Sequence, residues 1–567
     1  MGAAPIAIAA SREMSFLPIS AIVGFTHTAK SFVSRPQLFL FSLCLAGLAG
    51  CGDPTPTVSD FGSGTVKGFG GAVAADEPRA ALVARDVLSG GGSAADAAVA
   101  AYFTLAVTLP STAGLGGGGA CLVHDKSKKK VEAILFLPQA ASGGQVGLPL
   151  NARGMALLQA RYGRMRWAQL LAPAETLALQ GTAVSRALAR EIATAGDKLR
   201  RDPELARIFV AADGHLLREG DALLQPELGS VMSQLRIQGA GALYGGGVAA
   251  RLVESANATG QSLTLDMLRG AVPEVVAPIT VDFGSRSLYF TPPPADGGLV
   301  TAELMGLLTS VKSWSDASAE VRPHLFAEAS MRSFADRGHW QQPGGDSAVP
   351  VKNVLSESYL DELMAGYSAD QATPAKALNP PPLPVRQENP WAASFVTVDK
   401  QGNAVACNVT LNDLFGSGRM VPGTGIILAP APGQGGQDPY SLGPVMLASE
   451  TSGSFYFAAA ASGGVTAASA TAQVLLEVVA AKQPLQAAVT ARRIHHNGDP
   501  DSVFHEPNLD PVVQQSLTSR GHQLQQADIL GRVQAVWCPK SVDSSGSGCE
   551  SAADPRGDGL AAVLEGQ

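Results

Sequence analysis

Residues 394–411, with the sequence SFVTVDKQGNAVACNVTL, carry the pattern that decides the fold. Two stretches rich in β-branched and apolar residues, 394–399 and 404–411, flank the polar turn KQGN at 400–403. Two such runs separated by a short turn that contains glycine predict a β-hairpin. The preceding segment, TPAKALNPPPLPVRQENP at 373–390, contains too much proline for a regular helix or a central strand. The hairpin therefore begins just after a sharp change in composition.

Helical and strand patterns alternate outward from this hairpin. Residues 76–107 have the apolar spacing of two consecutive helices, interrupted at Gly90 and restarted at Ser93, with Asp96 completing a capping pattern. Further expected elements are strands near 120–124, 131–137 and 455–460, a mainly helical region over 151–380, a loop rich in Gly and Pro at 430–443 and a helix over about 466–481. The chain is therefore expected to combine helices with β-sheet.

Composition excludes several classes of function. The chain has 567 residues, a net charge of −8, 46% hydrophobic residues and 16% charged residues. A long chain with few charges can bury a sizeable core and is not mostly disordered. Because the chain is mildly acidic and has no long run of Lys and Arg, nucleic acid is not an expected partner.

The N-terminal region resembles an export signal. Arg35 precedes a 13-residue apolar run, LFLFSLCLAGLAG at 38–50, and Cys51 follows it. The sequence LAGC at 48–51 resembles a bacterial lipobox, which predicts lipidation of Cys51, a flexible tether over 52–66 and a membrane-anchored protein of the cell envelope, on the periplasmic side. The alternative is an ordinary secretory signal in which Cys51 occurs by chance.

Export implies an oxidising compartment, so the remaining cysteines can form disulfides. Cys538 and Cys549 flank a polar loop and form the expected pair. Cys121 and Cys407 lie in predicted strands, where two small buried side chains are a simpler interpretation than a bridge. The sequence contains neither CxxC nor HExxH, and the adjacent His495 and His496, taken to lie at a helix end, favour a structural role, so we expect no metal and no cofactor.

Several longer segments resemble one family, the γ-glutamyltransferases (glutathione hydrolases). They are GGGSAADAAVAAYFTLAVTLPSTAGLGGGGACLVHD at 90–125, VTVDKQGNAVACNVTLNDLFGSG at 396–418, ASGGVTAASATAQVL at 461–475, ARRIHHNGDP at 491–500 and SAADPRGDGLAAV at 551–563. They occur in the family's order over roughly residues 67–567. The resemblance implies an α+β fold, the four-layer αββα sandwich of N-terminal-nucleophile hydrolases. In it, a large-subunit-like region 67–391 and a small-subunit-like region 392–567 form one intertwined module.

The resemblance also implies a chemistry. Members of this family cut their own chain, and the threonine that becomes N-terminal attacks the γ-carbonyl of a γ-glutamyl amide with its own amine as base. Two glycine amides form the oxyanion hole. An arginine and a pair of serines bind the substrate carboxylate, and an acidic side chain binds its amine.

Matched position by position with the family, this chain retains the surrounding motifs but lacks the reactive side chains. The nucleophile position is Ala392, and the arginine position is Leu137. The serine pair corresponds to Met446 and Leu447, and the acidic ligand falls near Gln434. Four residues that support the nucleophile or form the oxyanion hole in active relatives are retained: Thr410, Asn412, Gly463 and Gly464. A strand-end and turn-holding role explains these four without catalysis.

Two hypotheses follow from these losses. The first is an exported lipoprotein with the family fold that neither cuts itself nor acts on γ-glutamyl groups, and that binds an unknown small molecule or protein at the cell envelope. The second is an amide hydrolase or acylase that uses Ser394 as a shifted N-terminal nucleophile. Ser394 faces the same side as Ala392 but starts one pleat, about 7 Å, further along the strand. Thr397 lies mid-strand and alternates to the opposite face, so it is a poor candidate.

Overall fold

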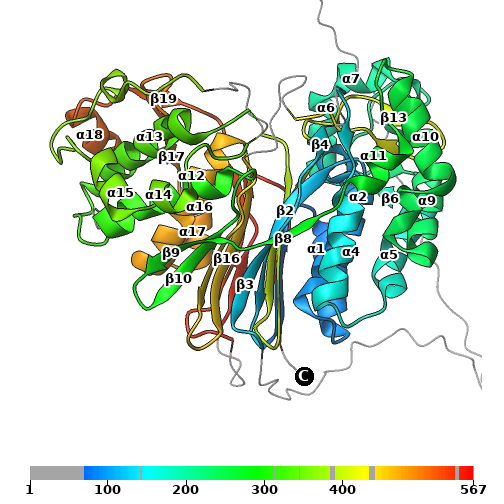
Figure 1. The fold of residues 1–567 in the computed structure, drawn as a ribbon, viewed down its shortest axis with the longest axis horizontal. Coiled ribbons are helices and arrows are strands. Elements are labelled where there is room, and N and C mark those ends of the chain that lie inside the picture. The colour runs from blue at the N-terminus through cyan, green and yellow to red at the C-terminus, as the bar shows by residue number, and fades with distance from the viewer. Residues whose placement is uncertain are drawn as a thin grey trace, which may run out of the picture. The chain divides into compact units, whose positions relative to one another are not determined.

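The computed structural model describes residues 69–140, 144–311, 314–343, 345–383, 390–432, 441–542 and 548–565. They belong to one compact unit that extends from Thr65 to Gln567. Two β-sheets lie face to face in its centre, and a layer of helices covers the outer side of each (Figure 1). This is the expected αββα sandwich. The predicted lipidation site Cys51, the tether over 52–66 and Gln434 lie outside the described residues.

The larger sheet has seven strands in the order β22-β1-β11-β12-β2-β3-β8. Its strands are β1 (Phe69–Ala75), β2 (Gly118–Asp125), β3 (Lys130–Phe136), β8 (Glu274–Val276), β11 (Ala393–Asp399), β12 (Ala404–Thr410) and β22 (Leu560–Glu565). The predicted hairpin is the antiparallel pair β11 and β12, in which Phe395 lies opposite Cys407. β11 also pairs with β1, so strands from distant parts of the chain alternate in this sheet.

The second sheet has six strands in the order β21-β20-β16-β15-β10-β9. Its strands are β9 (Ile279–Phe283), β10 (Arg286–Phe290), β15 (Val445–Ser449), β16 (Ser454–Ser462), β20 (Arg532–Trp537) and β21 (Glu550–Ala552). The expectation that residues 151–380 are mainly helical missed β8, β9 and β10. These strands are short and only partly buried. β8 pairs with β3 and β10 pairs with β15, both distant in the sequence, and β9 pairs with β10.

Helices α1 (Pro78–Ser89) and α2 (Ala94–Thr108) cover the larger sheet. Pro78 occupies the first turn of α1, and Ser93 and Asp96 form the predicted capping box of α2. The rest of this layer comprises α3 (Pro110–Ala113), α4 (Asn151–Tyr162), α5 (Trp167–Gln180), α6 (Arg186–Thr194), α7 (Gly196–Arg201), α8 (Pro203–Phe209), α9 (Pro226–Gln238), α10 (Gly246–Asn257) and α11 (Leu265–Gly270). All 15 residues of α2 are buried, as expected for a helix that is apolar on every side.

Other helices cover the second sheet. They are α12 (Gly297–Gly306), α13 (Arg322–Trp340), α14 (Val351–Val354), α15 (Glu357–Leu363), α16 (Val465–Leu475), α17 (Leu485–Thr490) and α18 (Pro511–Ser519). A π-helical turn over Leu476–Ala480 extends α16, so the predicted helix over about 466–481 is present. A small sheet of β17 (Ile494–His495), β18 (Val503–His505) and β19 (Leu524–Gln526) completes this layer. Within the described ranges, no helix combines the length and the apolar character needed to cross a membrane.

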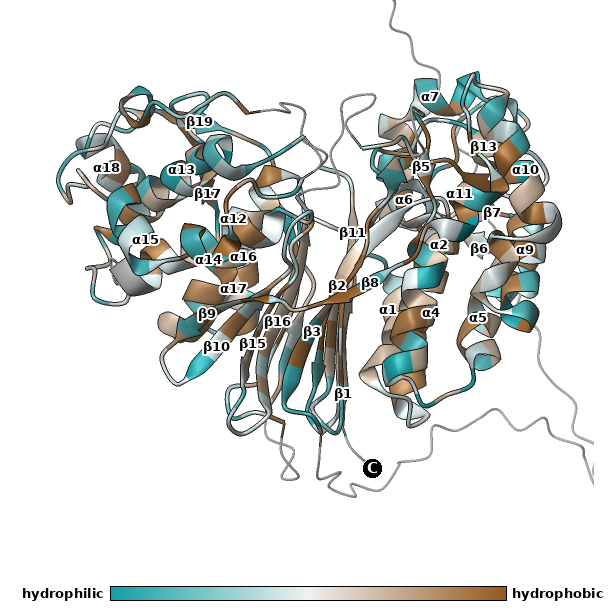
Figure 2. Ribbon diagram, viewed as in Figure 1, coloured by the Kyte–Doolittle hydropathy of each residue, from teal (hydrophilic) through white to brown (hydrophobic). Residues whose placement is uncertain are grey.

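Alternation along β11 divides its side chains between two cores. Val396 and Val398 pack between the sheets, whereas Ala393 and Phe395 pack against the helices. Thr397 also faces the helices and donates a hydrogen bond to the carbonyl of Ala94 at 2.8 Å, as predicted from the alternation. Hydrophobic residues are concentrated on the strands and on the inward sides of the helices (Figure 2).

Both cysteine pairs form disulfides. Cys538 bonds to Cys549, as predicted. Cys121 bonds to Cys407, so the interpretation as two unlinked buried side chains is wrong. The strand register explains the difference, because Cys407 on β12 lies directly opposite Cys121 on β2. The sequence shows that each cysteine lies on a strand, but it does not show that the two strands are neighbours.

Candidate functional site

Ala392, at the predicted nucleophile position, lies at the start of β11 and is 6% exposed. Its methyl group belongs to a small apolar cluster with Ala120, Leu135, Leu137, Ala295 and Leu442. The structure therefore brings Ala392 and Leu137 together, as the resemblance implies for the nucleophile and arginine positions. Neither Ala392 nor Leu137 carries a hydroxyl or a positive charge.

Met446 and Leu447, at the predicted serine-pair positions, are central residues of β15. Both are fully buried. Met446 packs between the two sheets, and Leu447 faces the helices that cover the second sheet. Neither side chain offers a hydrogen bond to a carboxylate.

Thr410 and Asn412 hold the chain at the entry to β11. The Thr410 hydroxyl donates to the carbonyl of Trp391 at 2.7 Å and accepts the backbone N–H of Asn412 at 2.8 Å. Asn412 has a φ of 58° and its amide donates to the carbonyl of Pro430 at 3.3 Å. These contacts are structural ones, and they fit the strand-end role that the sequence suggests for both residues.

Gly463 and Gly464 form the turn between β16 and α16. Gly463 has a φ of 133°, and a Cβ there would lie 2.8 Å from the Cα of Gly531 and 2.8 Å from Oγ1 of Thr466. Gly464, with a φ of 64°, is the N-cap of α16. Because a side chain fits poorly at either position, packing alone requires glycine in this turn.

Ser394 is fully buried between the sheets. Its hydroxyl accepts a hydrogen bond from the amide of Asn408 at 2.9 Å, and the same amide nitrogen donates to the carbonyl of Ala461. The backbone N–H of Ser394 donates to Asp76 at 2.7 Å, and its carbonyl accepts from the N–H of Asp76 at 3.1 Å. Hydrogen bonds therefore hold the hydroxyl, the N–H and the carbonyl of Ser394 in place.

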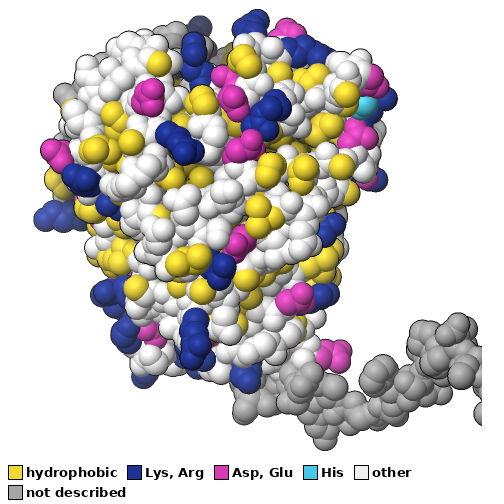
Figure 3. All heavy atoms as spheres, turned by 90° about the vertical axis from the view of Figure 1, so that its right-hand side faces the viewer, with side chains coloured by type: hydrophobic (Ala, Val, Ile, Leu, Met, Phe, Trp, Pro, Cys, Tyr) yellow, Lys and Arg dark blue, Asp and Glu magenta, His cyan; other side chains and the backbone are white. Residues whose placement is uncertain are grey.

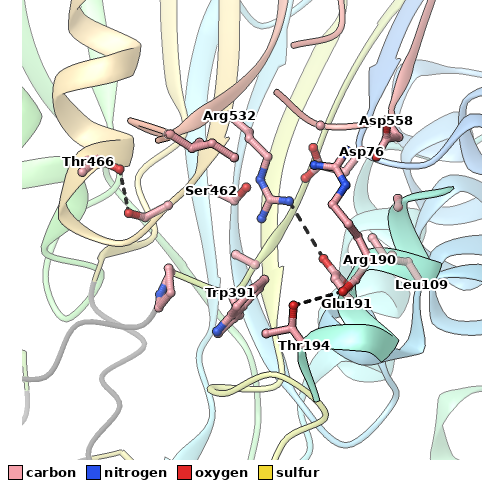
Figure 4. Close-up of a pocket in the computed structure, with 17 residues that line it drawn as sticks. Asp76, Leu109, Arg190, Glu191, Thr194, Trp391, Ser462, Thr466, Arg532 and Asp558 are labelled. Carbon is pink, nitrogen blue, oxygen red and sulfur yellow. Dashed lines mark hydrogen bonds and ion pairs between the residues drawn. The ribbon is translucent and has the colours of Figure 1, made fainter. Parts of the chain in front are cut away.

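A cavity of about 280 Å³ opens beside Ala392 and Gly463 (Figure 4). Its walls include Trp391, Leu109 and Ile529, together with charged residues that sequence reasoning did not single out. These are Asp76 after β1, Arg190 and Glu191 on α6, Arg532 on β20 and Asp558. No local motif marks them as a group, because they come from segments far apart in the sequence.

Both carboxyl oxygens of Asp76 accept hydrogen bonds from neighbouring residues. Besides accepting from Ser394, it accepts from the amide of Gln534 at 2.7 Å. Burial raises the pKa of Asp76, against the lowering effect of the Arg532 charge and of these hydrogen bonds. Its carboxyl group therefore connects β1, β11 and β20 at the edge of the cavity.

Glu191 is the second buried carboxyl group beside the cavity. Burial raises its pKa to about 7, with the Arg532 charge opposing the shift. The hydroxyl of Ser111 donates a hydrogen bond to one carboxyl oxygen. The other oxygen lies 4.0 Å from Nη1 of Arg532, beyond hydrogen-bond distance.

Replacing Glu191 with Gln is expected to change how stability depends on pH. The raised pKa means that the folded chain holds a proton that the unfolded chain releases above about pH 4.5. Wild-type stability should therefore fall as pH rises toward 7, by about 3 kcal/mol from this group. Urea unfolding of both proteins at several pH values measures the difference, which should favour Glu191→Gln increasingly as pH rises from 4.5 to 8. A constant difference would contradict the assignment.

The adjacent His495 and His496 lie at the end of β17, not at a helix end as expected. His495 bonds through Nδ1 to the Ser469 hydroxyl at 2.9 Å, and His496 accepts the N–H of Gly498 at 3.2 Å. Both are buried. These contacts give the pair structural roles, in the sense predicted.

A different group, His324, Glu328 and His522, has the composition of a metal site, with ligand atoms within 4.8 Å of one another. Its atoms are already paired: Nδ1 of His324 lies 2.8 Å from Nε2 of His522, and Glu328 accepts from Arg332 at 2.6 Å and from the N–H of Thr373 at 2.8 Å. A cation would compete with the Arg332 guanidinium for the same carboxylate.

The outer face of the first helical layer shows Lys and Arg side chains scattered among Asp, Glu and hydrophobic ones (Figure 3). Neither sign of charge gathers into one large patch on this face. Such a surface lacks the continuous basic stripe that proteins use to follow a phosphate backbone.

Comparisons with known proteins agree with the fold described above. The family model described as Gamma-glutamyltranspeptidase matches residues 80–432 and 429–564. The glutathione hydrolase proenzyme of Pseudomonas aeruginosa is 30% identical over 88% of this chain and 95% of its own length. The acylase ACY 1 proenzyme of Pseudomonas sp. strain SE83 is 27% identical over 90% of this chain and 97% of its own. The crystal structure of cephalosporin acylase from Bacillus halodurans superposes with a TM-score of 0.76 and 25% identity, covering 91% of this chain and 99% of the other.

Proposed function

The chain belongs to the gamma-glutamyltranspeptidase family, and we propose that it is a pseudoenzyme within that family. It neither cuts itself nor transfers or hydrolyses γ-glutamyl groups, and it works by binding a small molecule or a protein. One observation carries the proposal: Ala392, which the resemblance matches to the nucleophile position, packs in the same apolar cluster as Leu137, which it matches to the arginine position.

The chemistry of these side chains supports the loss of both steps. An alanine methyl group has no oxygen with which to attack a carbonyl or to start chain scission. A γ-glutamyl substrate carries a carboxylate and an ammonium group, and burying an unpaired charge costs several kcal/mol. The apolar side chains of Leu137, Met446 and Leu447 leave the carboxylate without the charge-assisted hydrogen bonds that would offset this cost.

The acylase hypothesis based on Ser394 has less support. Its hydroxyl is buried and accepts from Asn408, and its backbone pairs with Asp76, so a cut before Ser394 would remove Ala393 from an established strand pairing. Ser394 also lies one pleat, about 7 Å, further along the strand than Ala392, and is displaced from Gly463 accordingly. Efficient nucleophilic attack tolerates a displacement well below about 1 Å. Similarity to acylases supports the fold equally well for both hypotheses.

The proposal includes export and lipid attachment at Cys51, with a role at the cell envelope. This part rests on the apolar run at 38–50 and the sequence LAGC at 48–51. The two disulfides are compatible with an oxidising compartment.

The intact mass of the purified mature protein, under denaturing and reducing conditions, tests the proposal. We expect a single chain that starts near Cys51, and no glutamate released from glutathione by the same sample. Reduction is required because the Cys121–Cys407 bond would hold the two halves together after a cut between them. A second chain that begins at Ser394, or measurable glutamate release, would contradict the proposal, whereas ragged ends within 373–390 would indicate an external protease.

The variant Ala392→Thr is the matched control. It restores the hydroxyl but leaves Leu137, Met446 and Leu447 unchanged, so glutamate release should remain undetectable. A variant that released glutamate would show that the substrate site survives and that only the nucleophile was lost.

A further inference from the structure

The cavity beside Ala392 presents a partly buried guanidinium group with unused donors. The Arg532 side chain is 19% exposed, and its one ion pair, with Glu191, spans 4.0 Å. Within the described part of the chain, its guanidinium makes no hydrogen bond of normal length. Because Arg has five N–H donors and stays charged, a largely buried guanidinium without an acceptor is costly.

Ser462 is a second unpaired group at the same place. It lies directly opposite Arg532 in the antiparallel pairing of β16 with β20, so both side chains project from the same face of the sheet. Ser462 is 1% exposed and lines the cavity, and its hydroxyl has no hydrogen-bond partner among the residues that the structure describes. Figure 4 shows it beside the Arg532 guanidinium.

The other charged groups around the cavity are already occupied. Asp76 accepts from Ser394 and Gln534, and Asp558 forms an ion pair with Arg190. Glu191 accepts a hydrogen bond from Ser111, which lies outside the cavity lining. Among the described residues of the lining, Arg532 and Ser462 therefore combine substantial burial with donors that make no hydrogen bond.

The remaining wall is apolar. Trp391 and Leu109 line the cavity, and Ile529 is 47% exposed at the same site. The volume of about 280 Å³ is far larger than the roughly 30 Å³ that one water molecule occupies in the liquid. A small inorganic anion bound here would leave this apolar surface exposed to water.

We infer that this cavity binds a small organic acid, whose carboxylate pairs with Arg532 and Ser462 while its apolar body lies against Trp391 and Ile529. A carboxylate suits the planar donor fork of arginine, and it also satisfies the unpaired serine hydroxyl. The inference rests on the proposed function, because it gives a ligand class to the binding role. Ala392 is part of the cavity lining, whereas the substituted substrate-binding positions Leu137, Met446 and Leu447 are not.

Protonation of Glu191 should strengthen binding. The charged groups that face it are Arg532 on β20, Asp76 after β1 and Arg190 on its own helix, and burial sets its pKa at about 7. Below that pH the carboxyl group is neutral and no longer competes for the Arg532 charge. Carboxylate affinity should therefore rise as pH falls from 8 to 6.

Calorimetric titration of the full-length protein with benzoate, and with the neutral isostere benzamide, tests the site. Benzoate should bind with a Kd of about 1 mM or tighter, and benzamide at least about tenfold more weakly, because it cannot form the ion pair. Arg532→Gln should weaken benzoate binding by about tenfold or more, and Ser462→Ala by about fivefold. No benzoate binding at about 10 mM, or equal binding of benzamide, would overturn the inference.

Two further variants separate binding from folding. Arg186→Gln removes an exposed arginine on the same helix as Glu191, and should leave benzoate affinity unchanged. Arg532→Lys keeps the charge but loses the fork, so it should bind benzoate with intermediate affinity while near-UV circular dichroism stays native. Native Arg532→Gln protein with unchanged affinity would overturn the site. Glutamate release from glutathione, assayed in the same samples, would contradict the proposed function and leave the benzoate result intact.

Discussion

Removing the Cys121–Cys407 disulfide should lower the free energy of unfolding by about 5 kcal/mol. The bond joins residues 286 positions apart and links β2 to β12 in the middle of the larger sheet. A cross-link that closes so long a loop restricts the unfolded chain more than a short one does. Both cysteines are also fully buried, so water cannot readily fill the space that their sulfur atoms leave.

The double variant Cys121→Ala/Cys407→Ala measures this contribution by urea unfolding. Cys538→Ala/Cys549→Ala is the matched control, because its loop spans only 11 residues and the expected loss is about 3 kcal/mol. Equal losses from the two variants, or a larger loss from the control, would contradict the loop-closure explanation.

Acidification from pH 6.5 toward 4 should also destabilise the protein strongly. Burial lowers the pKa of His495 and of His522 to about 3, and that of His496 and of His124 to about 4. Nearby positive charge adds to the effect at His495, where His496 and Arg337 contribute. The unfolded chain binds protons at these residues below about pH 6.5 while the folded chain does not, so stability falls as pH falls. Each histidine contributes about 1.4 kcal/mol per pH unit in this interval.

The variant His495→Asn isolates one contribution. Asn can still bond to the Ser469 hydroxyl, which His495 contacts at 2.9 Å, but it does not titrate. Its unfolding free energy should therefore fall less steeply between pH 6 and pH 4 than that of the wild type, by about 1.4 kcal/mol per pH unit. The control Ser469→Ala removes the hydrogen bond without removing a titratable group, and should lower stability by a similar amount at every pH. An unchanged slope in His495→Asn would contradict the assigned pKa.

The sequence predicted the elements whose local pattern is strong. The hairpin at 394–411 is β11 and β12, and the capped helices of 76–107 are α1 and α2. It missed β9 and β10, which are short and only partly buried: β10 pairs with β15 from a distant part of the chain, and β9 pairs with β10 at the edge of the sheet. The Cys121–Cys407 bond was also missed, because strand register across 286 residues is not a local property.

The candidate site was likewise predictable from the sequence only in part. Ala392 and Leu137 could be matched to family positions through flanking motifs, and the structure places them in one cluster. The cavity with Arg532 and Glu191 could not be predicted, because β20 and α6 have no shared motif. The folded chain brings these two side chains within 4.0 Å of each other, although they lie more than 300 residues apart in the sequence.

The strand order of the larger sheet bears on what the proposed loss of the nucleophile leaves intact. β11 lies between β1 and β12, so the strand that starts beside Ala392 is held by hydrogen bonds on both edges. β1 also pairs with β22, which joins the first and last described strands. None of these strand pairings involves the peptide bond between Trp391 and Ala392. If the proposed loss of the nucleophile is correct, the scaffold therefore outlasts it, with the neighbouring cavity open to selection for a different ligand.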